Sequence, residues 1–130
     1  MMMSNKFNAK KVVTAEGVFD SYKEYDRYLQ LRLLERCGKI FKLERQVVFT
    51  LIPAQYESYE RYGKTGKRLK DGKRCVEKGC KYKADFLYYD DHGNRVIEDT
   101  KGYKKGAAYD LFCIKRKLML WVHGIRIKET

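Results

Sequence analysis

The sequence has few of the nitrogen and sulfur side chains that build metal centres, with two histidines and four cysteines among 130 residues. His92 falls in a predicted turn and His123 at a predicted helix end, so the two do not form the tight cluster that a histidine-based site needs. Cys75 and Cys80 are separated by four residues and could supply half of a zinc site. A tetrahedral site needs two further ligands, and no histidine is near them in the sequence. We therefore expect no structural zinc.

Long apolar runs are also missing. No run approaches the roughly 18 residues of a membrane span, and residues 1–11 are polar and basic, without the apolar segment of a signal peptide. We expect no membrane association and a cytoplasmic protein whose cysteines stay reduced.

Acidic residues are scarce relative to basic ones. The chain has 17 Asp and Glu against 29 Lys and Arg, a formal net charge of +12. Such a surface attracts polyanions, and nucleic acid is the usual polyanionic partner of a small basic domain. Hydrophobic residues make up 44% of the chain, which is enough for one packed domain. Charge alone does not separate an enzyme from a binding module.

Helical periodicity appears twice. Residues 21–37 place Tyr22, Tyr25, Leu29 and Leu33 at a spacing of three or four, and Gly38 is a natural stop. Residues 107–123 repeat this spacing before Gly124, with one face made of Leu111, Ile114, Leu118 and Val122.

Strand patterns occupy much of the remaining chain. We predict strands over residues 44–53, 81–89, 95–101 and 125–127, and a short extended piece around 11–14 within a basic arm of residues 1–17. The turn Asp90-Asp91-His92-Gly93-Asn94 joins two of these strands into a hairpin. The order helix, three strands, helix, strand favours an α/β fold, a mixed sheet flanked by helices with its last strand added by a crossover.

Residues 61–83 differ from the remainder, because they hold ten Lys or Arg residues, several glycines and only two acids. We interpret them as a basic loop or flexible hairpin, an insertion at about 56–80 within a single domain of residues 18–130. Its tyrosines could stack on unpaired bases, whereas a disordered solubilising loop is the alternative. DNA binding would be salt-sensitive and weakly sequence-specific. The predicted DNA contacts, including three lysines outside this segment, are Arg61, Lys64, Lys67, Arg68, Lys70, Lys73, Arg74, Lys104, Lys105 and Lys115.

Three charged residues of the predicted hairpin are candidates for chemistry. Asp99 and Lys101 are two apart in one strand and share a face, and Asp85 lies on the strand across the turn. Two carboxylates beside a lysine repel each other unless a cation lies between them. Mg²⁺ suits such oxygen ligands and can neutralise charge on a phosphate, so the pattern indicates phosphodiester hydrolysis. A β-bulge would instead bring Glu98 into the site in place of Asp99.

These residues resemble a known motif. Ala84-Asp85-Phe86 and Glu98-Asp99-Thr100-Lys101-Gly102 look like the two halves of the PD-(D/E)XK nuclease motif, with Ala84 where the motif has proline. The segment Phe19-Asp20-Ser21-Tyr22-Lys23-Glu24 is similar to the start of a phage and prophage domain of uncharacterised function placed in that superfamily.

The resemblance implies a restriction-endonuclease-like αβββαβ core. It also implies Mg²⁺, with Mn²⁺ as a substitute, held by Asp85 and Asp99, with Lys101 as the catalytic lysine and Glu24 as an auxiliary metal-binding acid. The implied function is a phage or prophage DNA endonuclease in a bacterial cell. Resolvase-like action on Holliday junctions, as a homodimer, rests on resemblance alone.

Several alternatives remain open from the sequence. Ser21-x-x-Glu24 is also a capping box, in which Glu24 closes the helix N-terminus instead of binding metal. Asp99 and Lys101 could form an exposed ion pair of little energetic value. The whole chain could be a non-catalytic DNA-binding accessory protein that keeps the nuclease fold, or a binder of RNA or of acidic proteins.

Overall fold

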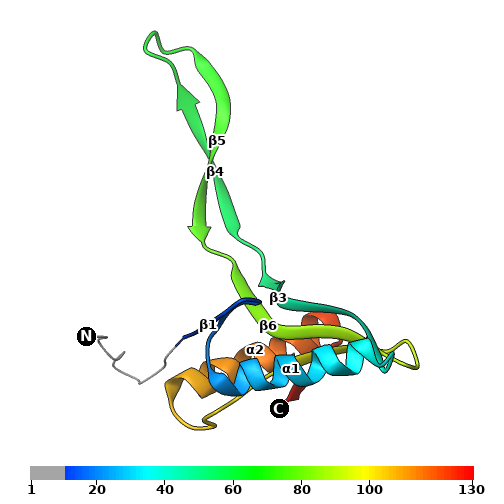
Figure 1. The fold of residues 1–130 in the computed structure, drawn as a ribbon. Coiled ribbons are helices and arrows are strands. Elements are labelled where there is room, and N and C mark those ends of the chain that lie inside the picture. The colour runs from blue at the N-terminus through cyan, green and yellow to red at the C-terminus, as the bar shows by residue number, and fades with distance from the viewer. Residues whose placement is uncertain (1–10) are drawn as a thin grey trace. The chain divides into compact units, whose positions relative to one another are not determined.

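The computed structural model describes residues 11–130, and these form two compact units (Figure 1). The first unit comprises the described residues up to Val47 together with Lys83–Thr130, and the second is Val48–Tyr82. Residues 1–10 of the predicted basic arm lie outside the described residues. After them, β1 (Val12–Thr14) pairs antiparallel with β2 (Gly17–Phe19).

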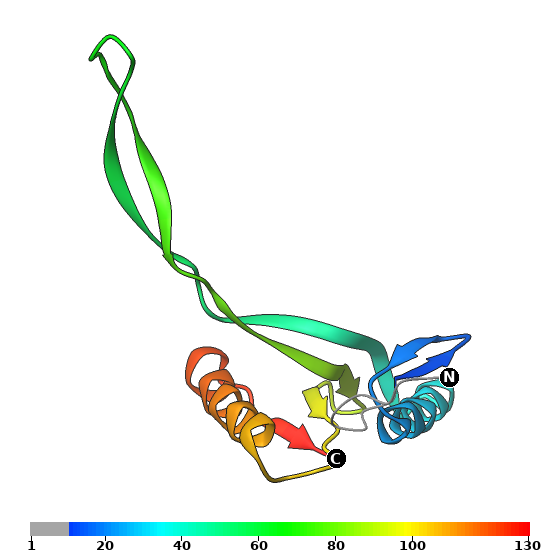
Figure 2. The same ribbon diagram turned by 90° about the vertical axis from the view of Figure 1, so that its left-hand side faces the viewer.

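The first unit is built on a four-stranded sheet. Its strand order is β3-β6-β7-β8, and the sheet lies between the two helices (Figure 2). Strands β3 and β6 each continue from the first unit into the second. The elements of this sheet and its helices are α1 (Tyr22–Arg36), β3 (Ile40–Ile52), β6 (Cys80–Asp90), β7 (Arg95–Asp99), α2 (Ala107–His123) and β8 (Ile127–Glu129).

The sheet is mixed, as the sequence predicts. Strands β6 and β7 pair antiparallel with Phe86 opposite Glu98, and β7 and β8 pair parallel with Asp99 opposite Glu129. The predicted hairpin and the crossover through α2 are therefore confirmed. In the turn, Asp90 Oδ1 accepts hydrogen bonds from the backbone N–H groups of His92 and Asn94, the local bonding by which aspartate favours turns.

Several strand boundaries differ from the prediction. Strand β3 begins at Ile40, four residues before the predicted start at 44. Strand β7 ends at Asp99, so Thr100 and Lys101 follow the strand instead of completing it. The last strand is Ile127–Glu129, not residues 125–127, because Gly124 ends α2 in the left-handed conformation and Ile125 N–H still donates to Met119 O.

The helices do not bury the apolar faces that their sequences display. In α1 the buried residues are Glu24, Tyr28 and Leu31, whereas Leu29 and Leu33 are exposed. Tyr28 and Leu31 join Phe19, Phe86 and Tyr88 in the core on this side of the sheet. Polar contacts explain which face of α1 is turned to the sheet, because Glu24 must also reach Gln46 of β3 and Arg27 must reach Glu98 of β7.

Helix α2 shows the same discrepancy. Its buried residues are Phe112 and Met119, seven positions apart, while Leu111, Ile114 and Val122 of the predicted face are exposed. Phe112 lies under the Lys101 ammonium group. Neither described helix has the length and apolar character that a membrane crossing requires.

Glu98 is fully buried and anchors α1 to the sheet. Arg27 donates to both of its carboxylate oxygens, from Nε and from the second terminal nitrogen, at 2.8 Å each, and the Tyr88 hydroxyl donates to it as well. Two parallel bonds from one guanidinium group are a strong and directional arrangement. The burial of Glu98 is thus compensated by donors from α1 and β6.

The second unit is a two-stranded hairpin. Strand β4 (Gln55–Tyr62) pairs antiparallel with β5 (Arg68–Glu77), so much of the segment interpreted as loop or hairpin is regular strand. Within Val48–Tyr82 the only buried side chains are Leu51 and Tyr82, and every residue of β4 is exposed. The Tyr59 ring crosses Gly72 so closely that a side chain at this position would have to displace the ring.

The anchoring role of Glu98 predicts a large stability effect. Glu98→Ala leaves the Arg27 charge without its partner and is expected to lower the free energy of unfolding by about 3–5 kcal/mol, measured by urea denaturation. Asp91→Ala removes an exposed carboxylate of the neighbouring turn and should change stability by less than about 1 kcal/mol. Equal effects of the two substitutions would contradict this account.

Candidate active site

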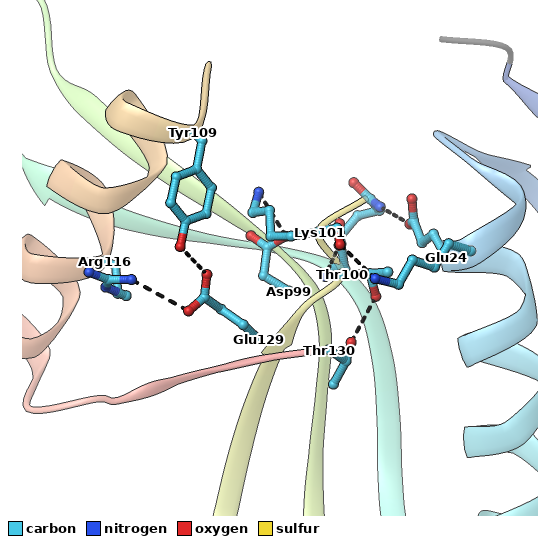
Figure 3. Close-up of polar contacts among 11 residues, drawn as sticks. Glu24, Asp99, Thr100, Lys101, Tyr109, Arg116, Glu129 and Thr130 are labelled. Carbon is cyan, nitrogen blue, oxygen red and sulfur yellow. Dashed lines mark hydrogen bonds and ion pairs between the residues drawn. The ribbon is translucent and has the colours of Figure 1, made fainter. Parts of the chain in front are cut away.

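The candidate site lies where the N-terminal end of α1 meets the adjoining ends of β6 and β7. Glu24 comes from the first turn of α1, Asp85 from β6 and Asp99 from the last position of β7. Figure 3 shows Asp99 and Lys101 between Glu24 on one side and Tyr109 on the other. All of these residues belong to the first unit.

Asp85 and Asp99 form the centre of the site. The register of β6 and β7 sets Phe86 opposite Glu98, which places Asp85 and Asp99 next to this pair on the neighbouring strands. Asp85 Oδ2 accepts the backbone N–H of Thr100 at 2.8 Å, and its side chain shares a hydrogen bond with that of Asp99. Burial, followed by the negative charge of Asp99, raises the pKa of Asp85 to about 8. Asp85 and Asp99 therefore form a closely spaced acidic pair.

Lys101 points back toward this pair. Its Nζ lies 3.1 Å from Asp99 Oδ1 and 4.0 Å from the centroid of the Phe112 ring, and the side chain is 23% exposed. Its backbone is fixed as well, since Lys101 N–H donates to Thr130 O and Lys101 O accepts Lys23 Nζ at 2.6 Å. Lys101 is therefore held between α1, α2 and the last strand.

Glu24 both caps α1 and faces the acidic centre. Ser21 Oγ accepts Glu24 N–H at 3.1 Å, and Glu24 Oε2 accepts the N–H of Asp20, one residue before the cap. The other oxygen, Oε1, accepts Gln46 Nε2 at 2.9 Å. Desolvation is the main cause of the raised pKa of Glu24, and the negative charges of Asp20 and Asp99 also contribute. The two interpretations of Glu24 do not exclude each other.

The donor set fits a hard divalent cation. One carboxylate oxygen each from Asp20, Glu24 and Asp85 lie within 4.8 Å of one another, and Asp99 is close enough to raise the pKa values of Glu24 and Asp85. Oxygen ligands of this kind are those that Mg²⁺ and Mn²⁺ accept. A bound cation would offset the repulsion that, after burial, contributes to these raised pKa values.

One acid of this site was missed from the sequence. Asp20 was not predicted, although its spacing of four from Glu24 across the helix cap was a usable signal. Gln46, in the predicted strand 44–53, can from the sequence either face the site or bond across the sheet, and the structure has it donating to Glu24. The φ of Gln46, 55°, lies in the left-handed region, a conformation that costs about 1–2 kcal/mol. Nothing in the sequence indicated this conformation.

A second polar group lies beside the site on α2 and β8. Glu129, opposite Asp99 in the sheet, accepts the Tyr109 hydroxyl at 3.0 Å and lies 3.4 Å from Arg116. Both of its oxygens are therefore engaged by α2 (Figure 3). This group connects α2 to the strand that carries Thr130.

The remaining predicted residues lie elsewhere. Glu98 is directed to Arg27 and Tyr88 and is not brought into the acidic centre, which excludes the bulged register for this structure. Lys104 and Lys105 are exposed between β7 and α2, and Lys115 is half-buried on α2. The other predicted DNA contacts, Arg61, Lys64, Lys67, Arg68, Lys70, Lys73 and Arg74, belong to the second unit.

The raised pKa of Asp85 predicts a pH-dependent stability without metal. Between about pH 4 and pH 8 the unfolded chain loses the Asp85 proton while the folded protein retains it, because the ordinary value of 3.8 rises to about 8 on folding. The free energy of unfolding in EDTA should therefore fall as pH rises through this window. Urea denaturation at several pH values measures this decline.

Asp85→Asn should weaken that decline, since asparagine does not titrate and can still accept the Thr100 N–H. Asp91→Asn, in the exposed turn, serves as the matched control and should keep the wild-type decline. An unchanged pH profile in Asp85→Asn would show that Asp85 titrates normally.

Comparison with known proteins gives a family. Searches of curated proteins and of solved structures found no match. A family model described as "Protein of unknown function (DUF1064)" matches residues 4–123. Since this match spans most of the 130 residues, the chain belongs to the DUF1064 family.

Proposed function

We propose that the chain is a divalent-metal-dependent endonuclease that hydrolyses phosphodiester bonds of DNA. The observation that carries the proposal is the convergence of Asp85, Asp99 and Lys101 beside the acids of α1. Carboxylates crowded next to a fixed ammonium group are what the PD-(D/E)XK motif places at the end of a β-hairpin. The strand order β3-β6-β7-β8 between two helices is compatible with the αβββαβ core of that superfamily.

The acids would hold Mg²⁺ or Mn²⁺. Asp85, Asp99 and Glu24 are the proposed ligands. Oxygens of Asp85 and Glu24 converge with one of Asp20, and Asp99 lies against Asp85. When bound, the cation supplies Lewis-acid stabilisation of the charge on the phosphate. A bound cation would thus compensate the mutual repulsion of these acids, which otherwise destabilises the fold.

The protein's own residues would position the reactants. Lys101 Nζ can donate to the attacking water or to a phosphate oxygen, since both the Phe112 ring and Asp99 hold its ammonium group in place. In hydrolysis the water oxygen attacks phosphorus as a P–O ester bond breaks. Thr100 N–H and Gln46 Nε2 keep Asp85 and Glu24 oriented toward the site.

The basic surface would bind the substrate. The proposed contacts are the seven cations of the hairpin unit named above, with Lys104, Lys105 and Lys115 of the first unit. A role on branched or replicative phage DNA in a bacterial cytoplasm, carried out by a homodimer, rests on the resemblance to phage nucleases. Lysine and arginine contacts to phosphates would make binding salt-dependent.

Plasmid nicking tests the proposed activity. The wild-type chain should nick supercoiled plasmid, or cut a synthetic four-way junction, with Mg²⁺ or Mn²⁺ and not with EDTA. Asp99→Ala and Lys101→Ala should each reduce the rate by about 100-fold or more, since each removes a group that acts on the phosphate or its metal. Asp91→Ala and Lys39→Ala, at exposed positions of the first unit, should keep the rate.

Salt-sensitive DNA binding without cleavage in any metal would overturn the enzyme and favour a DNA-binding accessory protein. No affinity for DNA at low salt would favour an RNA or acidic protein partner instead.

Mn²⁺ binding decides the role of Glu24. Glu24→Gln keeps an oxygen that can accept the Asp20 N–H but removes a charge, so Mn²⁺ affinity measured by calorimetry should fall by about 10-fold or more. Ser21→Ala is the matched control, because it removes the side-chain cap, costing about 0.5–2 kcal/mol of stability, without removing a carboxylate. If Glu24→Gln lowers stability while Mn²⁺ affinity is unchanged, Glu24 is a cap and not a ligand.

A further inference from the structure

The hairpin of the second unit presents charge on both of its faces. Lys73 lies opposite Ser58, whereas Arg61 lies opposite Leu69. The register shifts between Tyr59 and Arg61, where β5 carries one residue more than β4. Along β4 the alternation continues, so Arg61 shares the face of Tyr59, whereas Lys73 shares the face of its partner Ser58. Lys64 and Lys67 occupy the turn, which is closed by hydrogen bonds from Gly63 N–H to Lys67 O and from Gly66 N–H to Gly63 O. Cations therefore surround the ribbon.

These cations are available for a partner. The ion pairs of the hairpin engage Arg68 with Asp71 and Arg74 with Glu57. The others make no ion pair with any residue in the described part of the chain: Arg61, Lys64, Lys67, Lys70 and Lys73. Two strands with no buried side chain between Gln55 and Glu77 have no core of their own, and such a ribbon is marginal in isolation. An anionic partner would stabilise it.

The tyrosines of this segment differ in their surroundings. Tyr59 lies across the Gly72 backbone, and the Arg74 guanidinium is 4.5 Å from its ring centroid. Tyr82 is buried, whereas Tyr56 and Tyr62 are 62% and 58% exposed. Stacking on unpaired bases needs an open ring face, so the structure disfavours it for Tyr59 and Tyr82 but not for Tyr56 and Tyr62.

We propose that the β4–β5 hairpin inserts into the major groove of duplex DNA, with its two charged faces directed to the phosphates on either side. A two-stranded ribbon fits the B-form major groove, which is about 12 Å wide. A ribbon lying flat on a strand would need cations on one face only, whereas a ribbon between two phosphate walls needs them on both. This inference deepens the proposed function, because it names duplex DNA as the form that is bound.

Binding in EDTA tests the proposal without any cleavage. Fluorescence anisotropy of the full chain with labelled oligonucleotides should show a DNA duplex bound about 10-fold or more tighter than the same single strand. The DNA duplex should also be bound tighter than an RNA duplex, because side chains cannot enter the deep, narrow major groove of RNA. Equal or tighter binding of the single strand or the RNA duplex would overturn the proposal.

Single substitutions test the two faces separately. Arg61→Ala and Lys73→Ala should each reduce the slope of log K against log salt concentration by about 1. Lys39→Ala, an exposed cation of the first unit, should leave the slope unchanged. An effect of only one of the two hairpin cations would show a ribbon bound by one face, and an effect of neither would show that the hairpin is not the contact.

These outcomes are independent of nuclease activity. If the protein passes both binding tests but nicks no plasmid, groove binding by the hairpin is supported and the proposed enzyme activity is refuted. If the protein nicks plasmid while its hairpin variants bind normally, the enzyme activity is supported and groove binding by the hairpin is refuted.

Discussion

The mutual repulsion of acids at the end of one β-hairpin is the constraint on which this structure depends. Asp85 and Asp99 lie side by side on β6 and β7, and Glu24 and Asp20 add their carboxylates from the start of α1. Burying such a group is costly unless hydrogen bonds or a cation compensate it. Each carboxylate has its own compensating donor: Thr100 N–H for Asp85, Gln46 for Glu24 and Lys101 for Asp99.

The same sheet uses its two faces for different purposes. Glu98 and Asp99 are neighbours in β7, yet Glu98 is neutralised by Arg27 and joins α1 to the sheet, while Asp99 remains in the acidic centre. Strand alternation separates the structural carboxylate of Glu98 from the proposed metal ligand Asp99 at adjacent positions. A substitution at one position can therefore change stability without changing the acidic centre, and the reverse.

Sequence patterns predicted the elements better than their faces. The hairpin of β6 and β7, the span of α2 and the pairing of Asp85 with Asp99 followed from turn chemistry and from the period of two. Lys101 reaches Asp99 as well, but from beyond the end of the strand that was predicted to carry it. The buried faces of both helices did not follow from apolar spacing. The inward face of α1 carries Glu24, which hydrophobicity places outside, and Leu29 is left exposed. The backbone of Gln46 is itself left-handed and interrupts the alternation of β3, so the period of two does not say which face its side chain takes.

The pairing of Thr130 with the site has a consequence for how the protein is made. Thr130 N–H donates to Asp99 O, and Thr130 O accepts Lys101 N–H, so β8 fixes the segment that carries both residues. During synthesis this segment leaves the ribosome well before β8, because all of α2 is made between them. A nascent chain thus carries its acids and its lysine in an unfinished arrangement until the final strand docks.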